Sequence, residues 1–194
     1  MKRVVLVALV CIVSILPAAF ADAGSSLKAK VFVFDPDGTG IITATWMAGQ
    51  GLPDTGASNR GLVLQKSGPT ATNASGGVVI EGAESMTITE LGFDVRADGH
   101  CGAGAPRFNL VDASGTLSFL GCNSGSVVTP DTPVAGWNRI RFPSAVGLIV
   151  SSLAIVFDEG TDTPQTGLVV TPGSVVIDNI QINEVTIGRP GNAP

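Results

Sequence analysis

The chain has 194 residues, including 25 glycines and 12 prolines, and its formal net charge at pH 7 is −5. The glycines follow no period, which excludes collagen, and glycine and proline together are too few for a disordered low-complexity chain. The acidic balance disfavours nucleic acid and anionic membranes as partners, because both are bound through basic patches.

Residues 1–21 have the pattern of a signal peptide. Lys2 and Arg3 precede an apolar run over residues 4–16, and Ala19-Phe20-Ala21 supplies a cleavage signal. The run is shorter than the roughly 20 residues of a membrane helix, so we expect no membrane span in the mature chain. Cleavage removes both of these cations and Cys11, which leaves nine basic and 16 acidic residues, a formal charge of −7. The pattern predicts a secreted protein, extracellular or periplasmic if the source is a Gram-negative bacterium.

Short segments rich in β-branched and apolar residues follow in chain order. They lie at 27–34, 41–47, 62–66, 78–81, 86–95, 106–111, 116–120, 137–142, 148–157 and 174–187, with a shorter one at 168–170. Loops rich in glycine, proline and aspartate separate them, and neither a helical period nor a fixed repeat is present. About ten strands predict an all-β fold, a jelly-roll-like sandwich of two antiparallel sheets formed by residues 22–188 as a single domain. We expect residues 189–194 to fray.

The segment 86–95 carries its apolar residues in two phases. Met86 and Ile88 occupy one phase, whereas Leu91, Phe93 and Val95 occupy the other, so a β-bulge near Glu90 is predicted to turn both groups inward. Asp94 and Arg96 would then point outward. The predicted core includes Val31, Val33, Phe93, Phe108, Ile140, Phe157 and Ile177.

Cys101 and Cys122 are the two cysteines that remain after cleavage, and they flank the hairpin predicted for 106–111 and 116–120. The entry and exit points of a hairpin are neighbours in space, so we predict a disulfide between these cysteines. Zinc is the competing interpretation, but two cysteines and one histidine are too few for a usual structural site.

The catalytic inventory is small. His100 is the only histidine, and the sequence contains no G-x-S-x-G, no H-E-x-x-H and no phosphate loop, so we predict that the protein is not an enzyme. Asp158, Glu159 and Asp162 fall in one turn and Asp178 lies in the last strand. Such oxygen ligands suit a structural Ca²⁺, the competing interpretation being a solvated acidic loop.

The stretch 175–182, VVIDNIQI, resembles the closing strand of jelly-roll carbohydrate-binding modules. In such modules the acidic residue of this strand often helps to hold a structural calcium, which the resemblance implies for Asp178. The stretches HCGAGAPRFN and GWNRIRF are similar to uncharacterised secreted bacterial proteins, a resemblance that implies no activity.

Trp46 and Trp137 are the residues predicted to stack on sugar rings, with core packing as the alternative for both. The expected function is therefore non-catalytic binding by a secreted protein, with carbohydrate as the first ligand class. The alternative is an extracellular or cell-surface structural or adhesive protein that acts through protein contacts, for instance by pairing of strand edges.

Overall fold

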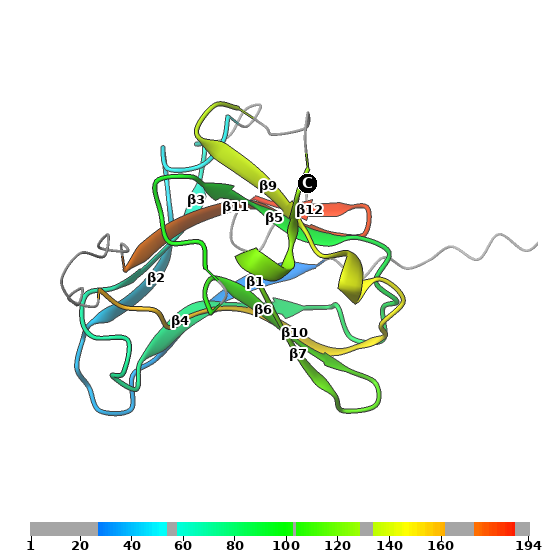
Figure 1. Ribbon diagram of the computed structural model, residues 1–194, viewed down its shortest axis with the longest axis horizontal. Helices are drawn as coiled ribbons and strands as arrows, with labels where there is room; N and C mark the ends of the chain where they lie inside the picture. Colours follow the sequence, from blue (N-terminus) through cyan, green and yellow to red (C-terminus); the bar gives the residue numbers. More distant parts are fainter. Residues whose placement is uncertain (1–26, 54–57, 103, 129–133, 162–172, 189–194) are drawn as a thin grey trace, which may run out of the picture.

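The alternating segments form two antiparallel sheets that pack face to face, in a computed structural model that describes residues 27–53, 58–102, 104–128, 134–161 and 173–188 (Figure 1). The strands are β1 (Lys28–Phe34), β2 (Ile42–Met47), β3 (Gly61–Lys66), β4 (Ser75–Glu81), β5 (Leu91–Arg96), β6 (Arg107–Asp112), β7 (Leu117–Gly121), β8 (Ser126–Val127), β9 (Trp137–Arg141), β10 (Val150–Phe157), β11 (Ser174–Ile182) and β12 (Val185–Ile187). Two short 3₁₀ turns, η1 (Cys122–Ser124) and η2 (Pro143–Ala145), complete the described elements. The prediction of an all-β sandwich of two antiparallel sheets is confirmed.

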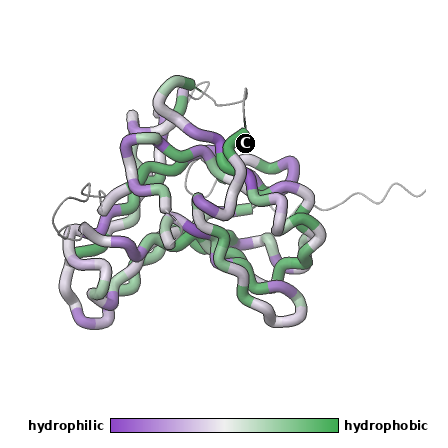
Figure 2. The backbone as a smooth tube through the Cα atoms, viewed as in Figure 1, coloured by the Kyte–Doolittle hydropathy of each residue, from purple (hydrophilic) through white to green (hydrophobic). Residues whose placement is uncertain are grey.

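The first sheet has the order β1-β4-β10-β6-β7, and the second has the order β2-β3-β11-β5-β9-β8 with β12 added beside β11. Figure 1 shows the five-stranded sheet along the lower side of the molecule and the larger sheet above it. Figure 2 shows that hydrophobic residues recur along the strands of both layers. The pairings of β4 with β1 and β10, of β10 with β6, of β11 with β3 and β5, and of β5 with β9 join strands that are not consecutive in sequence, so long-range contacts hold most of the fold together.

The core lies between the sheets and is filled by one phase of each strand. Phe93 of the larger sheet contacts Phe108 of the smaller sheet, with ring centroids 5.6 Å apart, and Phe142 lies 5.5 Å from both. The predicted core residues Phe93, Phe108, Ile140, Phe157 and Ile177 are buried, and Val31 is half-buried. Val33 is exposed, contrary to prediction, because it lies near the end of the edge strand β1, whereas Ala29 near the start of that strand is buried in the core.

The predicted single strand at 86–95 with a bulge near Glu90 is wrong, although the apolar residues of both phases do reach the core. Thr87 forms an isolated bridge with Ile149, beside the start of β10, whereas β5 begins at Leu91 in the opposite sheet. The chain changes sheets between these points, and this crossing turns Ile88 and Leu91 into the same core. A bulge occurs instead in β11, where Asn179 adopts a φ of 45° and the register shifts between Asp178 and Gln181. This bulge lets Ile177 and Ile180, which differ in phase, both face inward.

Asp94 was predicted to point outward, and it does leave the core, but it is fully buried on the outer side of the larger sheet. The Arg139 guanidinium donates to both of its oxygens at 2.9 and 3.1 Å, and Asn179 Nδ2 donates to Oδ2 at 2.8 Å. Asp178, its partner on the neighbouring strand, is also buried and accepts from the Leu52 backbone N–H at 2.7 Å. The segment around Leu52 therefore covers part of this sheet face, which is why an outward aspartate is buried there.

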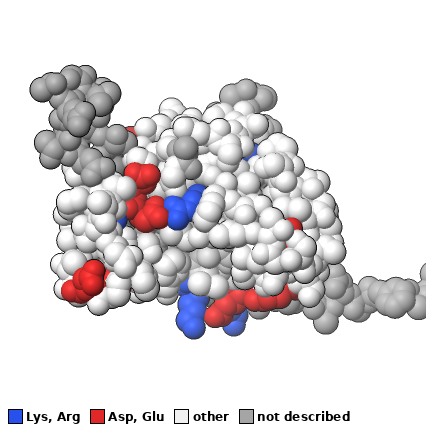
Figure 3. Space-filling view, turned by 60° about the horizontal axis from the view of Figure 1, so that its bottom comes forward, with Lys and Arg blue, Asp and Glu red and all other residues white. Residues whose placement is uncertain are grey.

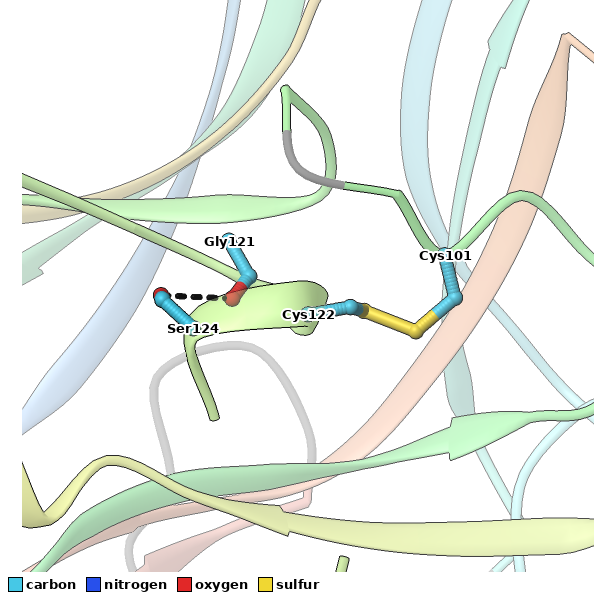
Figure 4. Close-up of a disulfide and its surroundings, with 4 residues drawn as sticks. All are labelled: Cys101, Gly121, Cys122 and Ser124. Atoms are coloured by element: carbon cyan, nitrogen blue, oxygen red, sulfur yellow. Dashed lines mark hydrogen bonds between the residues drawn. A yellow bond between two sulfur atoms is a disulfide. The ribbon is translucent and has the colours of Figure 1, made fainter. Parts of the chain in front are cut away.

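Cys101 and Cys122 form the predicted disulfide, with their Cα atoms 5.4 Å apart (Figure 4). It joins the loop before β6 to η1, which directly follows β7. Ser124 Oγ donates to the Gly121 carbonyl at 2.8 Å and closes the same turn. The β6–β7 hairpin is thus fixed at its open end.

Replacing both cysteines by alanine, as in Cys101→Ala/Cys122→Ala, is expected to lower the free energy of unfolding by about 3 kcal/mol, because the crosslink restricts the unfolded chain. Urea denaturation monitored by tryptophan fluorescence measures the change. Reduced wild-type protein serves as the control and should match the double variant; equal stability of the oxidised wild type and the variant would contradict the expectation.

Candidate functional site

The outer face of the five-stranded sheet is largely uncharged and hollow. The strand register sets two rows of outward residues across this sheet: Phe32, Gly77, Val156, Arg107 and Gly121 in one row, and Lys30, Val79, Ala154, Asn109 and Phe119 in the next. Figures 1 and 2 show the sheet arching, so that this lower face is concave. Figure 3 looks toward this side and shows its charges gathered in a few groups on an otherwise uncharged surface.

Small residues form the middle of the face and aromatic rings lie toward its edges. A Cβ atom at Gly77 would lie 3.1 Å from a ring carbon of Phe32 and 1.9 Å from the Ile155 carbonyl oxygen, so the glycine is required for the close approach of neighbouring strands. The Phe32 ring consequently lies against the sheet, over the glycine. On the same edge strand, Phe34 is 50% exposed.

Arg107 organises the opposite half of the face. Its guanidinium carbon lies 5.3 Å from the centroid of the Phe119 ring, within the range of a cation–π contact. The same guanidinium donates to both Asp158 oxygens at 2.7 Å, in a bidentate pair, and Nε donates to Asn109 Oδ1 at 3.0 Å. The side chain is therefore fixed, and Phe119 gains a rigid neighbour although it is itself exposed.

A cleft of about 490 Å³ opens at one end of this face. Its wall includes Phe34, the Arg107–Asp158 pair, Glu159, residues 70–74 of the β3–β4 loop and Ser75 of β4. Aromatic, amide, hydroxyl and carboxylate groups thus meet in one hollow, which places polar groups beside an apolar surface.

Lys66 forms the buried support of the cleft. Its side chain is only 1% exposed, and its ammonium donates to the backbone carbonyls of Thr70, Thr72 and Asp158 at 2.9, 2.7 and 2.7 Å. A buried ammonium is tolerated only when it is fully hydrogen-bonded, and three carbonyl partners match its three donors. The lysine therefore ties the β3–β4 loop to the end of β10, the two segments that carry most of the cleft wall.

The formal charges of the cleft cancel. Lys66 and Arg107 supply two cations, and Asp158 and Glu159 supply two anions. Asp158 is neutralised directly by Arg107, whereas Glu159 receives a long contact, 3.5 Å, from the Thr70 hydroxyl. The balance favours a neutral ligand that offers both hydrogen-bond donors and acceptors.

The tryptophans predicted to bind a ligand lie elsewhere. Trp46 is 5% exposed and belongs to the main core, and Trp137 is 9% exposed and packs with Leu52 and Val176 on the outer side of the larger sheet. Neither indole presents a face to solvent. Sequence reasoning missed Phe34 and Phe119, since an alternating strand does not reveal which of its two faces another segment will cover.

The predicted calcium ligands are separated. Asp158 and Glu159 line the cleft, Asp178 lies in the other sheet, and Asp162 falls outside the described residues. Within the described ranges, no group of three or more His, Cys, Asp and Glu side chains is placed to hold a metal ion.

A second, smaller hollow of about 290 Å³ lies on the larger sheet, beside Gln50, Gln65 and Arg96. Arg96 donates to Asp98 at 2.7 Å and to Gln50 at 2.9 Å, which uses two of its five N–H groups within the protein. Among the described residues, no aromatic ring lines this hollow. The cleft beside Phe34 is therefore the stronger candidate.

Comparison with protein-family models, with curated proteins and with solved structures finds no significant match. In the part of the chain that the structure describes, no helix has the length and apolar character needed to cross a membrane. The candidate site is thus defined by its own geometry.

The substitution Lys66→Met is expected to destabilise the protein by about 3 kcal/mol, because it leaves the three carbonyl groups without their buried donor. Urea denaturation measures the loss, and hydrogen exchange of residues 67–74 shows whether the loop is released. Lys30→Met is the matched control: this lysine is exposed and forms a 3.5 Å surface ion pair with Glu81, so its loss should cost less than about 0.5 kcal/mol. Equal effects of the two substitutions would contradict the role given to Lys66.

Added Ca²⁺ or EDTA is expected to leave the melting temperature unchanged, because an ion at Asp158 would have to displace the bidentate Arg107 guanidinium. Thermal denaturation in each condition measures this. A stabilising shift with Ca²⁺ that disappears in Asp158→Asn would instead support the calcium hypothesis.

Proposed function

We propose that this protein is a secreted, non-catalytic carbohydrate-binding protein whose ligand occupies the cleft beside Phe34. The observation that carries the proposal is the meeting of an exposed aromatic ring with a charge-balanced set of polar groups in one hollow of a concave sheet face. A sugar ring has an apolar face of C–H groups and a rim of hydroxyl groups. A site that binds a sugar ring therefore combines an apolar surface with hydrogen-bonding groups.

The individual groups of the cleft suit these needs. Phe34 supplies a flat apolar surface at the mouth, while Glu159 accepts hydrogen bonds and Asn73 both donates and accepts them. The Arg107–Asp158 pair is held rigid by its two 2.7 Å hydrogen bonds, so a ligand would meet groups that are already oriented. Secretion is supported by the signal-peptide pattern of residues 1–21 and by the disulfide, since disulfides persist mainly in oxidising compartments.

The substitution Phe34→Ala is expected to weaken binding of a neutral oligosaccharide about tenfold, which corresponds to about 1.4 kcal/mol of lost stacking. A glycan array with neutral and charged sugars identifies the ligand, and titration calorimetry of the best neutral sugar measures the affinity. Val33→Ala is the matched control, because Val33 is adjacent and equally exposed, at 52%, but belongs to the opposite phase of β1. Absence of any glycan ligand, or equal losses in the two variants, would refute the proposal.

A structural or adhesive role through protein contacts is the second candidate. It is favoured by the exposed apolar side chains of Leu117 and Phe119 on the edge strand β7, a position at which another chain is able to pair. A negative glycan array together with concentration-dependent self-association would favour this role over sugar binding.

A further inference from the structure

The edge strand β7 has no hydrogen-bonded neighbour on its outer side among the described strands. The Asp112 N–H donates to the Thr116 carbonyl at 3.0 Å, which makes these two residues a hydrogen-bonded pair of the β6–β7 hairpin. Because such pairs alternate along an antiparallel ladder, Ser118 and Leu120 also bond to β6. The N–H and C=O groups of Leu117 and Phe119 therefore point away from the sheet, whereas Gly121 is buried and its carbonyl already accepts from Ser124 Oγ.

The other described edges are protected. β1 carries Lys28 and Lys30, β8 has only two residues, and β12, which pairs only with β11, has only three. At β2, the Arg60 guanidinium donates to the Trp46 carbonyl at 3.3 Å, which places a cation on that edge. β7 has the sequence LSFLG, without charge or proline, and thus lacks the usual features that prevent pairing with another strand.

We propose that β7 pairs antiparallel with β7 of a second copy of this chain, about a two-fold axis at Phe119. In this register Phe119 faces Phe119 of the other copy, and Leu117 faces Gly121 of the other copy. The two Phe119 residues then form a hydrogen-bonded pair that exchanges both N–H···O bonds, and each Leu117 lies opposite the buried Gly121 of the other copy. A one-residue shift would pair residues whose backbone groups already bond to β6. The register with its two-fold axis at Phe119 avoids those residues.

The side chains suit the same register. Leu117 and Phe119 lie on the outer face, at 47% and 58% exposure, so pairing sets the two phenylalanine rings side by side and each leucine over a glycine. Pairing places no charge opposite a like charge, and Arg107 next to Phe119 is already neutralised by Asp158. A copy of the same edge therefore complements it in hydrogen bonding, size and charge.

The assembly would join two five-stranded sheets into one continuous sheet, with both concave faces on the same side. A single pair of edge strands forms a small interface, so the dimer belongs to the transient class. The inference does not depend on sugar binding, because it rests on the backbone of β7 and not on the cleft beside Phe34.

Disulfide trapping tests the register directly. Phe119→Cys should give an interchain disulfide under mild oxidation, because residues facing each other in a hydrogen-bonded pair have Cα atoms about 5.5 Å apart, within disulfide range. Leu117→Cys faces a glycine and should give at most a few per cent as much crosslink. Val146→Cys, equally exposed but in a loop, is the control for random collision. Peptide mapping identifies the link between the two substituted positions, one from each copy, and separates it from exchange with Cys101 or Cys122.

Sedimentation equilibrium of the wild-type protein provides a readout that needs no variant. The weight-average mass should rise with concentration toward that of a dimer. Phe119→Lys should abolish the rise, whereas Val146→Lys should retain it. A wild type that stays monomeric up to its solubility limit overturns the proposal, as does equal crosslinking of the three cysteine variants.

Discussion

Contact between three phenylalanine rings holds the two sheets face to face. Phe93 comes from the larger sheet, Phe108 from the smaller one, and Phe142 lies between the end of β9 and η2, with all three ring centroids within 5.6 Å of one another. Because both sheets must turn one phase of their strands toward this cluster, the opposite phase is turned outward on every strand. The distribution of exposed side chains follows from this constraint.

The outward faces of the two sheets differ in how far other described segments cover them. On the larger sheet, Leu52 packs with Trp137 and Val176, and its N–H caps Asp178, so part of that face is covered from outside. On the five-stranded sheet, Phe34, Val79 and Phe119 are exposed. Among the described residues this face is the less covered of the two, and the proposed cleft and the β7 edge both belong to it.

Buried polar groups connect the sandwich to its loops. The Lys66 ammonium donates hydrogen bonds to three backbone carbonyls and fixes the loop beside the cleft. On the larger sheet, the Asp94 carboxylate accepts hydrogen bonds from Arg139 and Asn179. Each group satisfies its own hydrogen bonds and so restricts the segments it contacts. At the cleft, Lys66 thereby joins the β3–β4 loop to the end of β10.

The sequence alone determined the class of fold, most strand positions and the disulfide. Strand period, turn residues and two cysteines that flank one hairpin are local properties of the sequence, and they suffice for those conclusions. Only the tertiary structure decided that Trp46 and Trp137 are buried while Phe34 and Phe119 are exposed, and that Asp158 pairs with Arg107 rather than standing beside Asp178. The physical reason is that alternation gives each strand two faces, whereas the burial of a face depends on segments distant in sequence, such as the residues around Leu52, whose positions no local pattern encodes.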